Sequence, residues 1–156
     1  MKAMVIPMTT TRRSTLRLTL AGVALSLARG VRAETPTALA VWKDPNCGCC
    51  DGWVRHMRDA GFRVTTSDSN NMEAVKRARG VPDELQSCHT AVIDGYVIEG
   101  HVPAEDIKRL IAERPGARGV AVAGMPRSAP GMDQPGEPYT VVLFGTPTGD
   151  KIYATH

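Results

Sequence analysis

The spacing of apolar residues changes several times along the chain, between the short uninterrupted runs typical of buried strands and the three- or four-residue spacing of amphipathic helices. Residues 38–42 form such a run, and residues 62–66 alternate like a half-buried strand. Helical spacing follows Cys50 and ends at Gly61, where a glycine is well suited to close a helix. This part of the chain therefore predicts a strand, a helix and a second strand.

A second group of elements follows, with equally distinct boundaries. Asn70 or Asn71 can cap a helix that ends at Gly80, and the Asp94-Gly95 pair between two apolar runs is typical of a β-hairpin. The remaining predicted elements are strands at residues 90–93 and 96–98 and a helix at residues 104–114. The order β-α-β-α-β-β-α predicts an α/β fold. With cysteines at the first strand-to-helix turn, this order looks like the thioredoxin fold.

Residues 116–138 interrupt this pattern, because they contain five glycines and four prolines in 23 positions. Such a composition predicts an irregular, partly rigid surface segment. The apolar run at residues 139–144 and the shorter run at residues 151–153 predict a further strand and a looser hairpin partner. We therefore expect the core to be followed by a Gly/Pro-rich segment and a terminal hairpin.

A length of 156 residues, with 42% hydrophobic and 22% charged residues, predicts one globular domain. The first 33 residues differ from the rest, because they carry six basic residues, no carboxylate and an apolar run at residues 18–28. This layout predicts an export signal at residues 1–33, and residues 11–17 resemble its twin-arginine form. The alternative is an uncleaved membrane anchor, which is disfavoured because the apolar run is too short to span a bilayer. We expect the domain at residues 34–156 to reside in the periplasm of a Gram-negative bacterium.

The basic residues of the predicted signal also give the whole chain a positive net charge that the domain at residues 34–156 does not have. The whole chain has 19 basic and 16 acidic residues, whereas residues 34–156 have 13 basic and 16 acidic residues. A mildly acidic domain lacks the basic surface that binds nucleic-acid phosphates. We therefore expect no nucleic-acid partner, and no membrane association after the signal is cleaved.

The four cysteines are the residues most informative about chemistry. Cys47, Cys49 and Cys50 lie at the predicted start of the first helix, where amide dipoles stabilise thiolates, and Cys88 precedes the third strand. Adjacent cysteines on a helix project in different directions, so these three cannot easily share one tetrahedral ion. In a thioredoxin-like arrangement the loop holding Cys88 faces the start of that helix. Four converging thiolates favour a bridged cluster of Cu(I), with about four ions to balance their charge.

Other uses of these cysteines stay open. Structural disulfides are common in exported proteins, and the feasible pairs are Cys47 with Cys50, or one cysteine of the cluster with Cys88. A thiol–disulfide oxidoreductase would use Cys47 as nucleophile and Cys50 as resolving thiol. An iron–sulfur carrier fits four cysteines but not their crowding at one turn. The packing of three cysteines at a helix start favours a metal site.

Two histidines and two methionines are further candidate ligands or supporting residues. His89 follows Cys88 and His101 begins the loop before the last helix, although a lone loop histidine more often faces solvent. Met125 and Met132 lie in the Gly/Pro-rich segment, and their thioethers suit Cu(I). That segment must cross the domain to reach the next strand. We therefore expect Met125 near the cysteine turn, as a weak ligand or a shield from solvent, with Met132 the lesser participant.

The other histidines and methionines are assigned no role. Met57 and Met72 occur in helical patterns and are expected in the core, whereas His56 and His156 are expected at the surface.

Several short motifs occur together in the chain, at residues 42–50 (WKDPNCGCC) with Trp53, 80–82 (GVP), 87–90 (SCHT), 99–104 (EGHVPA), 124–126 (GMP) and 131–132 (GM). In combination they resemble the periplasmic copper-resistance CopG family, over residues 38–144. The resemblance implies a thioredoxin-like domain that binds copper through Cys47, Cys49, Cys50 and Cys88. It also implies copper handling in periplasmic detoxification, by a change of oxidation state. Ordinary thioredoxins have a cis-proline where this chain has residues 87–90, which speaks against docking of protein disulfides.

The sequence therefore favours an exported copper-binding protein that holds Cu(I) in a polythiolate, multinuclear site and cycles copper between oxidation states. Its expected role is copper resistance or homeostasis. Its expected partners are copper ions and other periplasmic copper-handling proteins. The alternative is a periplasmic thiol–disulfide oxidoreductase that uses the pair Cys47 and Cys50.

Overall fold

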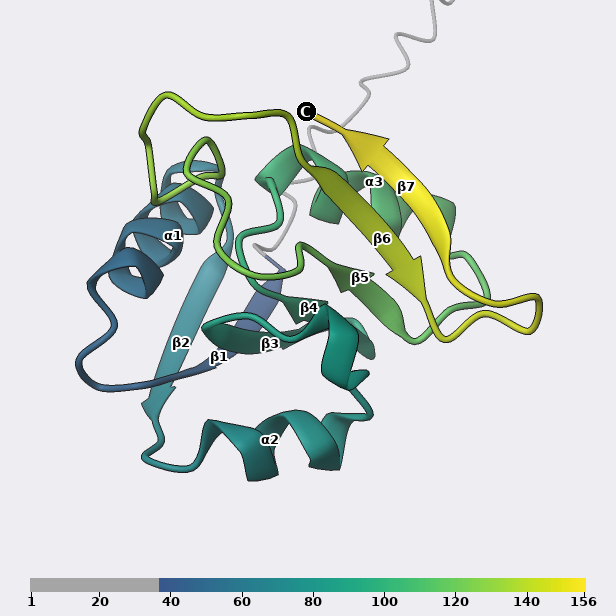
Figure 1. Cartoon of the computed structure of the whole chain (residues 1–156). Helices are drawn as coiled ribbons and strands as arrows, with labels where there is room; N and C mark the ends of the chain where they lie inside the picture. The colour runs from purple at the N-terminus through teal and green to yellow at the C-terminus, as the bar shows by residue number, and fades with distance from the viewer. Residues whose placement is uncertain (1–36) are drawn as a thin grey trace, which may run out of the picture. The chain divides into compact units, whose positions relative to one another are not determined.

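One seven-stranded sheet runs through the described part of the protein, which is residues 37–156 of the computed structural model (Figure 1). The export signal predicted for residues 1–33 lies outside these described residues. Within them, no helix is both long and apolar enough to cross a membrane. The elements in chain order are β1 (Ala38–Lys43), α1 (Gly48–Asp59), β2 (Arg63–Asp68), α2 (Met72–Arg79), the 3-10 helix η1 (Asp83–Leu85), β3 (His89–Ile93), β4 (Tyr96–Glu99), α3 (Ala104–Glu113), β5 (Gly119–Ala121), β6 (Thr140–Phe144) and β7 (Lys151–Thr155).

The strands lie in the order β2-β1-β3-β4-β5-β6-β7. β1 runs parallel to β2 and β4 runs parallel to β5, whereas the other neighbouring pairs are antiparallel. The α/β class is confirmed, and so are the order of the core elements and the terminal hairpin of β6 and β7. The likeness to thioredoxin that this order suggested stays a prediction.

Local sequence signals set several element boundaries as expected. The side chain of Asn71 caps α2, because its Oδ1 accepts a hydrogen bond from the amide of Ala74 at 3.0 Å. α2 ends at Gly80, whose φ of 69° lies in the left-handed region. Asp94 and Gly95 both have positive φ and connect β3 to β4 as a tight hairpin.

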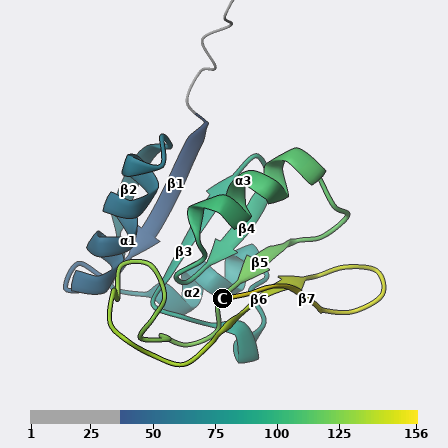
Figure 2. The same ribbon diagram turned by 90° about the horizontal axis from the view of Figure 1, so that it is seen from above.

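The sheet is covered on both faces, and each face has its own hydrophobic cluster. α1 and α3 pack on one face, where Trp53, Met57 and Ile107 are fully buried in the larger cluster. On the other face, a smaller cluster gathers around Phe144 and Leu85, near α2 and η1 (Figures 1 and 2). Because successive side chains of a strand point to opposite faces of the sheet, those of β3 and β4 are directed alternately to the two covered faces.

Helix α2 differs from the sequence expectation. Met72 was expected in the core but is only half-buried, and the residue that α2 buries is Lys76, at 4% exposure. The reason is a carboxylate on the neighbouring sheet: Lys76 Nζ lies 2.5 Å from Glu99 Oε1 and 3.1 Å from Thr90 Oγ1. A buried charge is tolerated when it is paired and hydrogen-bonded, as this ammonium is.

The Gly/Pro-rich segment also differs in part from its prediction. It includes the strand β5, whose three residues are buried between β4 and β6, so this portion is neither irregular nor at the surface. A run of three small and apolar residues is too short for a periodic signal. Gly119 is required at its start, because a Cβ there would collide with the backbone of Val97. The rest, up to Pro138, contains no helix or strand.

That irregular stretch comes to lie against α1 before it enters β6 (Figure 2). Gly131 and Gly52 approach so closely that a Cβ on Gly52 would meet the Gly131 oxygen at 2.6 Å. Gly131 has a φ of 86°, a conformation that other residues rarely adopt. Two glycines thus allow the segment to dock on the first turns of the helix that carries the cysteines.

We expect the substitution Gly52→Ala to lower the free energy of unfolding by about 1–3 kcal/mol, because the added methyl group would force the segment off α1. Urea unfolding measures this. The matched control is Gly48→Ala in the same helix, where a Cβ would meet no atom within 4 Å. Alanine there should leave stability unchanged or slightly increased, since it favours a helix over glycine. Equal stabilities of the two variants would contradict the docked arrangement.

Candidate metal centre

The cysteine-rich turn is shaped by the residues between β1 and α1. The amide of Cys47 donates to the carbonyl oxygen of Asp44 at 3.1 Å, and the amide of Asn46 donates to Asp44 Oδ1 at 2.8 Å. These bonds close a turn that places Cys47 at the N-cap of α1. Lys43 then ties the end of β1 to the helix through an ion pair with Asp51 at 3.2 Å. The cysteines therefore sit at the positive end of the helix dipole.

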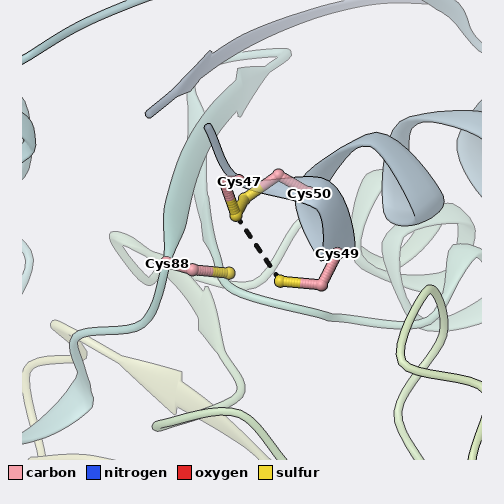
Figure 3. Close-up of side chains that lie close together, drawn as sticks. All are labelled: Cys47, Cys49, Cys50 and Cys88. Atoms are coloured by element: carbon pink, nitrogen blue, oxygen red, sulfur yellow. Dashed lines mark hydrogen bonds between the residues drawn. A yellow bond between two sulfur atoms is a disulfide. The ribbon is translucent and has the colours of Figure 1, made fainter. Parts of the chain in front are cut away.

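The structure brings all four cysteine sulfurs together, each within 4.8 Å of the others. Cys47 and Cys50 are joined by a disulfide, and Cys49 and Cys88 are free thiols. The sulfur of Cys49 lies 3.5 Å from that of Cys47. Figure 3 shows the sulfurs of Cys49 and Cys88 directed toward each other beside the disulfide. The cluster is thus assembled from two parts of the chain, although its role as a metal site stays a prediction.

Cys88 is held in place by a buried polar network beneath it. Glu99 is fully buried, and its Oε1 accepts a hydrogen bond from the amide of Ser87 at 2.7 Å. Its Oε2 accepts from the hydroxyl of Thr90 at 2.7 Å, and Lys76 supplies the opposite charge. Both oxygen atoms of the Glu99 carboxylate therefore have hydrogen-bond partners. The network fixes the backbone on both sides of Cys88, the residue that brings the fourth sulfur to α1.

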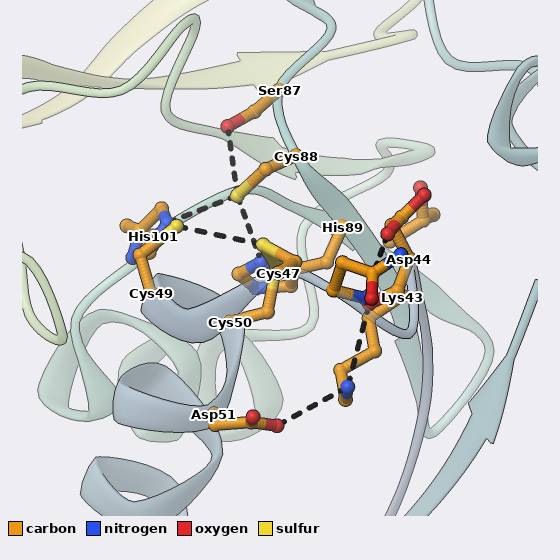
Figure 4. Close-up of a disulfide and its surroundings, with 12 residues drawn as sticks. Lys43, Asp44, Cys47, Cys49, Cys50, Asp51, Ser87, Cys88, His89 and His101 are labelled. Carbon is orange, nitrogen blue, oxygen red and sulfur yellow. Dashed lines mark hydrogen bonds and ion pairs between the residues drawn. A yellow bond between two sulfur atoms is a disulfide. The ribbon is translucent and has the colours of Figure 1, made fainter.

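Both candidate histidines are fully buried, although a loop histidine more often faces solvent. Cys88 Sγ lies 3.0 Å from His101 Nε2 and 3.3 Å from His89 Nδ1 (Figure 4). The ring of His89 also packs on Trp53, with ring centroids 4.3 Å apart. Sequence reasoning named both residues but could not show that two positions 12 residues apart meet at one sulfur.

Burial controls the protonation of these groups. It lowers the pKa of His89 well below its usual value, and the nearby His101 and Lys76 lower it further. Burial also lowers the pKa of His101. Both imidazoles are therefore neutral at pH 7, which is the form that binds metals. Burial, together with the nearby Cys49, raises the pKa of Cys88 to about 12. This thiol therefore stays protonated until a cation takes the place of its proton.

The two methionine candidates lie on the segment that passes the cysteines. The carbonyl oxygen of Gly124, next to Met125, accepts a hydrogen bond from Ser87 Oγ. The Met125 side chain is 56% exposed, whereas Met132 is half-buried beside Gly131. The segment is thus anchored next to Cys88. A part for either thioether in a metal site stays a prediction.

His56 is a residue whose contact sequence reasoning missed. It was expected at the surface, but it is half-buried and its Nε2 accepts a hydrogen bond from the amide of Ala104 at 3.2 Å. That amide belongs to the first turn of α3, where helix donors lack partners within the helix. His56 therefore links α1 to the start of α3 and lies outside the cysteine cluster.

An α/β domain whose helix N-terminus gathers four sulfurs, with two buried imidazoles beside them, defines a candidate centre for soft metal ions. The family model described as "Protein of unknown function, DUF411" matches residues 85–132. No curated protein matches the chain.

Two solved structures, both of the copper resistance protein CopG and named form 2 and form 1, are similar to this chain. Each is 45% identical to it, with a TM-score of 0.73 over 78% of this chain. The match covers 99% of the form 2 chain and 98% of the form 1 chain. The protein therefore belongs to the CopG family of copper resistance proteins.

We expect Cys88 to be alkylated slowly at neutral pH in the disulfide form, because a pKa of about 12 leaves about one thiolate in ten thousand at pH 8. Its rate with iodoacetamide should rise about tenfold per pH unit until the pH approaches 12. Mass spectrometry of peptides containing Cys88 follows the reaction. The variant Cys49→Ser should react faster at Cys88, since the nearby Cys49 contributes to the raised pKa of Cys88. A rate that levels off below pH 9 would contradict the raised pKa.

Proposed function

We propose that this protein binds Cu(I) through Cys47, Cys49, Cys50 and Cys88 in a polythiolate, multinuclear centre. The observation that carries the proposal is the position of four sulfur atoms within 4.8 Å of one another. Thiolates are soft ligands that prefer Cu(I), and about four such ions would balance four thiolate charges. Binding through all four residues requires that the disulfide between Cys47 and Cys50 is first reduced.

The same disulfide gives the centre a means to change the oxidation state of copper. When the thiolates of Cys47 and Cys50 form their sulfur–sulfur bond, each sulfur gives up one electron. Two Cu(II) ions that accept these electrons become two Cu(I) ions, so the exchange balances. An external reductant of the dithiol class would be needed to restore the thiolates. We propose this cycle as part of the copper handling by the protein.

The neighbouring side chains support such a centre in different ways. His89 and His101 adjoin Cys88 and supply neutral imidazoles, which copper accepts as ligands. We propose Met125, and to a lesser degree Met132, as accessory thioether donors or shields on the segment anchored next to Cys88. Their softness matches Cu(I), and the exposure of Met125 would allow it to meet an incoming ion.

We further propose that the protein acts in the periplasm, in copper resistance or homeostasis, and exchanges copper with other periplasmic copper-handling proteins. The support is the export-signal layout of residues 1–33 and the family, whose solved members are named copper resistance proteins.

A second candidate function is thiol–disulfide exchange. It is favoured by the disulfide between Cys47 and Cys50 at the start of α1. Cys47 is only half-buried and could be attacked or act as nucleophile, whereas Cys50 is fully buried, as suits a resolving thiol. This function needs neither Cys49 nor Cys88.

The fully reduced protein should bind more than one Cu(I) per chain, with sulfur as the dominant ligand in X-ray absorption. The variants Cys49→Ser and Cys88→Ser should each bind fewer ions, because each removes a bridging sulfur. Met72→Leu is the matched control, since it removes a sulfur far from the cysteines in the chain and should leave the copper count unchanged. A single ion bound by nitrogen and oxygen, or tight zinc binding without copper uptake, would overturn the proposal.

Insulin reduction separates the two functions. If the protein acts mainly on copper, the wild-type chain should reduce insulin disulfides slowly, since it has His89-Thr90 and not a cis-proline at the start of β3. Vigorous activity that survives in the double variant Cys49→Ser/Cys88→Ser would instead establish the oxidoreductase, because only the pair Cys47 and Cys50 would remain.

A further inference from the structure

A second set of potential metal ligands lies beside the four sulfurs and uses different chemistry. It consists of Cys88 Sγ, His89 Nδ1 and His101 Nε2, which lie within 4.8 Å of one another. The donors come from the start of β3 and from the loop after β4. None of them belongs to the Cys-Gly-Cys-Cys run on α1. Figure 4 shows both imidazoles directed toward the sulfur of Cys88.

The hydrogen bond of His101 prepares this ring as a ligand. Its Nδ1 donates to the carbonyl oxygen of Pro130 at 2.7 Å, which assigns the ring proton to that nitrogen. The lone pair of Nε2 is then free and faces Cys88 Sγ at 3.0 Å. A histidine that binds a metal commonly gives its other N–H to a carbonyl oxygen in this way, which fixes the orientation of the ring.

The surroundings of His89 are poorly explained if the residue is only structural. A fully buried histidine normally has hydrogen bonds at both nitrogens. Among the described residues, His89 Nε2 is one of two buried side-chain nitrogen or oxygen atoms without a partner, and Nδ1 faces Cys88 Sγ. A metal bound at Nδ1 would leave the ring proton on Nε2, and the ring is already held against Trp53. Coordination would therefore use Nδ1, the nitrogen that faces Cys88 Sγ.

The separations suit a small ion. Three ligand atoms that surround a metal in a plane, at bond lengths of about 2.0–2.3 Å, lie about 3.6 Å apart. The two imidazole nitrogens now lie 3.0 and 3.3 Å from Cys88 Sγ, so these two separations have to widen only slightly, and all three donors lie within 4.8 Å of one another. Two histidines with one cysteine form a trigonal set that is well known for mononuclear copper.

We propose that, while Cys47 and Cys50 are joined in the disulfide, the protein holds one copper ion at a mononuclear site formed by Cys88, His89 and His101. The disulfide removes two of the four sulfurs from the polythiolate centre but none of these three donors. The site shares Cys88 and its two neighbouring imidazoles with the proposed Cu(I) centre and rests on that proposal for the choice of metal, but it needs none of the three cysteines at the start of α1. Oxidation of the pair would then lower the number of bound ions to one, without releasing all copper.

The test uses the unmodified protein in its disulfide form, confirmed by a count of two free thiols per chain. Cu(I) is supplied as its acetonitrile complex without oxygen or thiol reductant. We expect one ion per chain, and X-ray absorption should show about two nitrogen ligands and one sulfur ligand. No bound copper, or coordination by sulfur alone through Cys49 and Cys88, would overturn the proposal. Because the chain is unaltered, a folding defect cannot produce either result.

Substitutions then assign the nitrogens. His89→Gln and His101→Gln should each weaken Cu(I) binding to the disulfide form at least about tenfold. His56→Gln is the matched control, because this histidine is half-buried but contacts Ala104, and its affinity should match the wild type. Unchanged affinity in both folded His89 and His101 variants would overturn the site. The copper count of the fully reduced chain tests the polythiolate centre separately, so either proposal can fail alone.

Discussion

The geometry of the cysteine cluster depends on the buried ion pair between Lys76 and Glu99. The two side chains are 5% and 0% exposed, and the carboxylate also accepts hydrogen bonds from Ser87 and Thr90. Loss of one partner from a buried pair costs about 3–5 kcal/mol, because it leaves a charge without compensation in the interior. The residues bonded to this carboxylate flank Cys88 in the sequence. A charge pair on the far face of the sheet from α1 and α3 therefore holds the loop that meets α1.

Crowding of four sulfurs creates an electrostatic problem that the protein solves in two ways without metal. Four thiolates within 4.8 Å would repel one another strongly, and the interior around them screens charge poorly. Cys47 and Cys50 avoid this repulsion as a disulfide, and the raised pKa of Cys88 keeps its thiol neutral. Cations that bind between the sulfurs would neutralise this repulsion. A soft cation that takes the place of the Cys88 proton would therefore offset both the burial and the neighbouring sulfur that raise the pKa of this thiol.

Most of the fold was predictable because its signals are local. The cap at Asn71 and the hairpin at Asp94 depend on residues within a few positions of one another. The cysteine run likewise indicates the turn between β1 and α1 from its own residues. The features that could not be predicted depend on partners distant in the sequence. Gly119 becomes strand because β4 and β6 lie on either side of it, and Lys76 is buried because Glu99 lies opposite. Likewise, the burial of His101 follows from a contact with Pro130, 29 positions away.

The Gly/Pro-rich segment connects the two sets of potential ligands. Gly131 rests on Gly52 in the helix that begins at the cysteine run, and the neighbouring carbonyl oxygen of Pro130 orients the ring of His101. Because these contacts belong to consecutive residues, the position of α1 and the orientation of the imidazole are set by one stretch of backbone. A displacement of that stretch would move both. The glycines and prolines of this segment thus serve a defined geometry, since Gly131 permits the close approach and Pro130 limits the freedom of the carbonyl that binds His101.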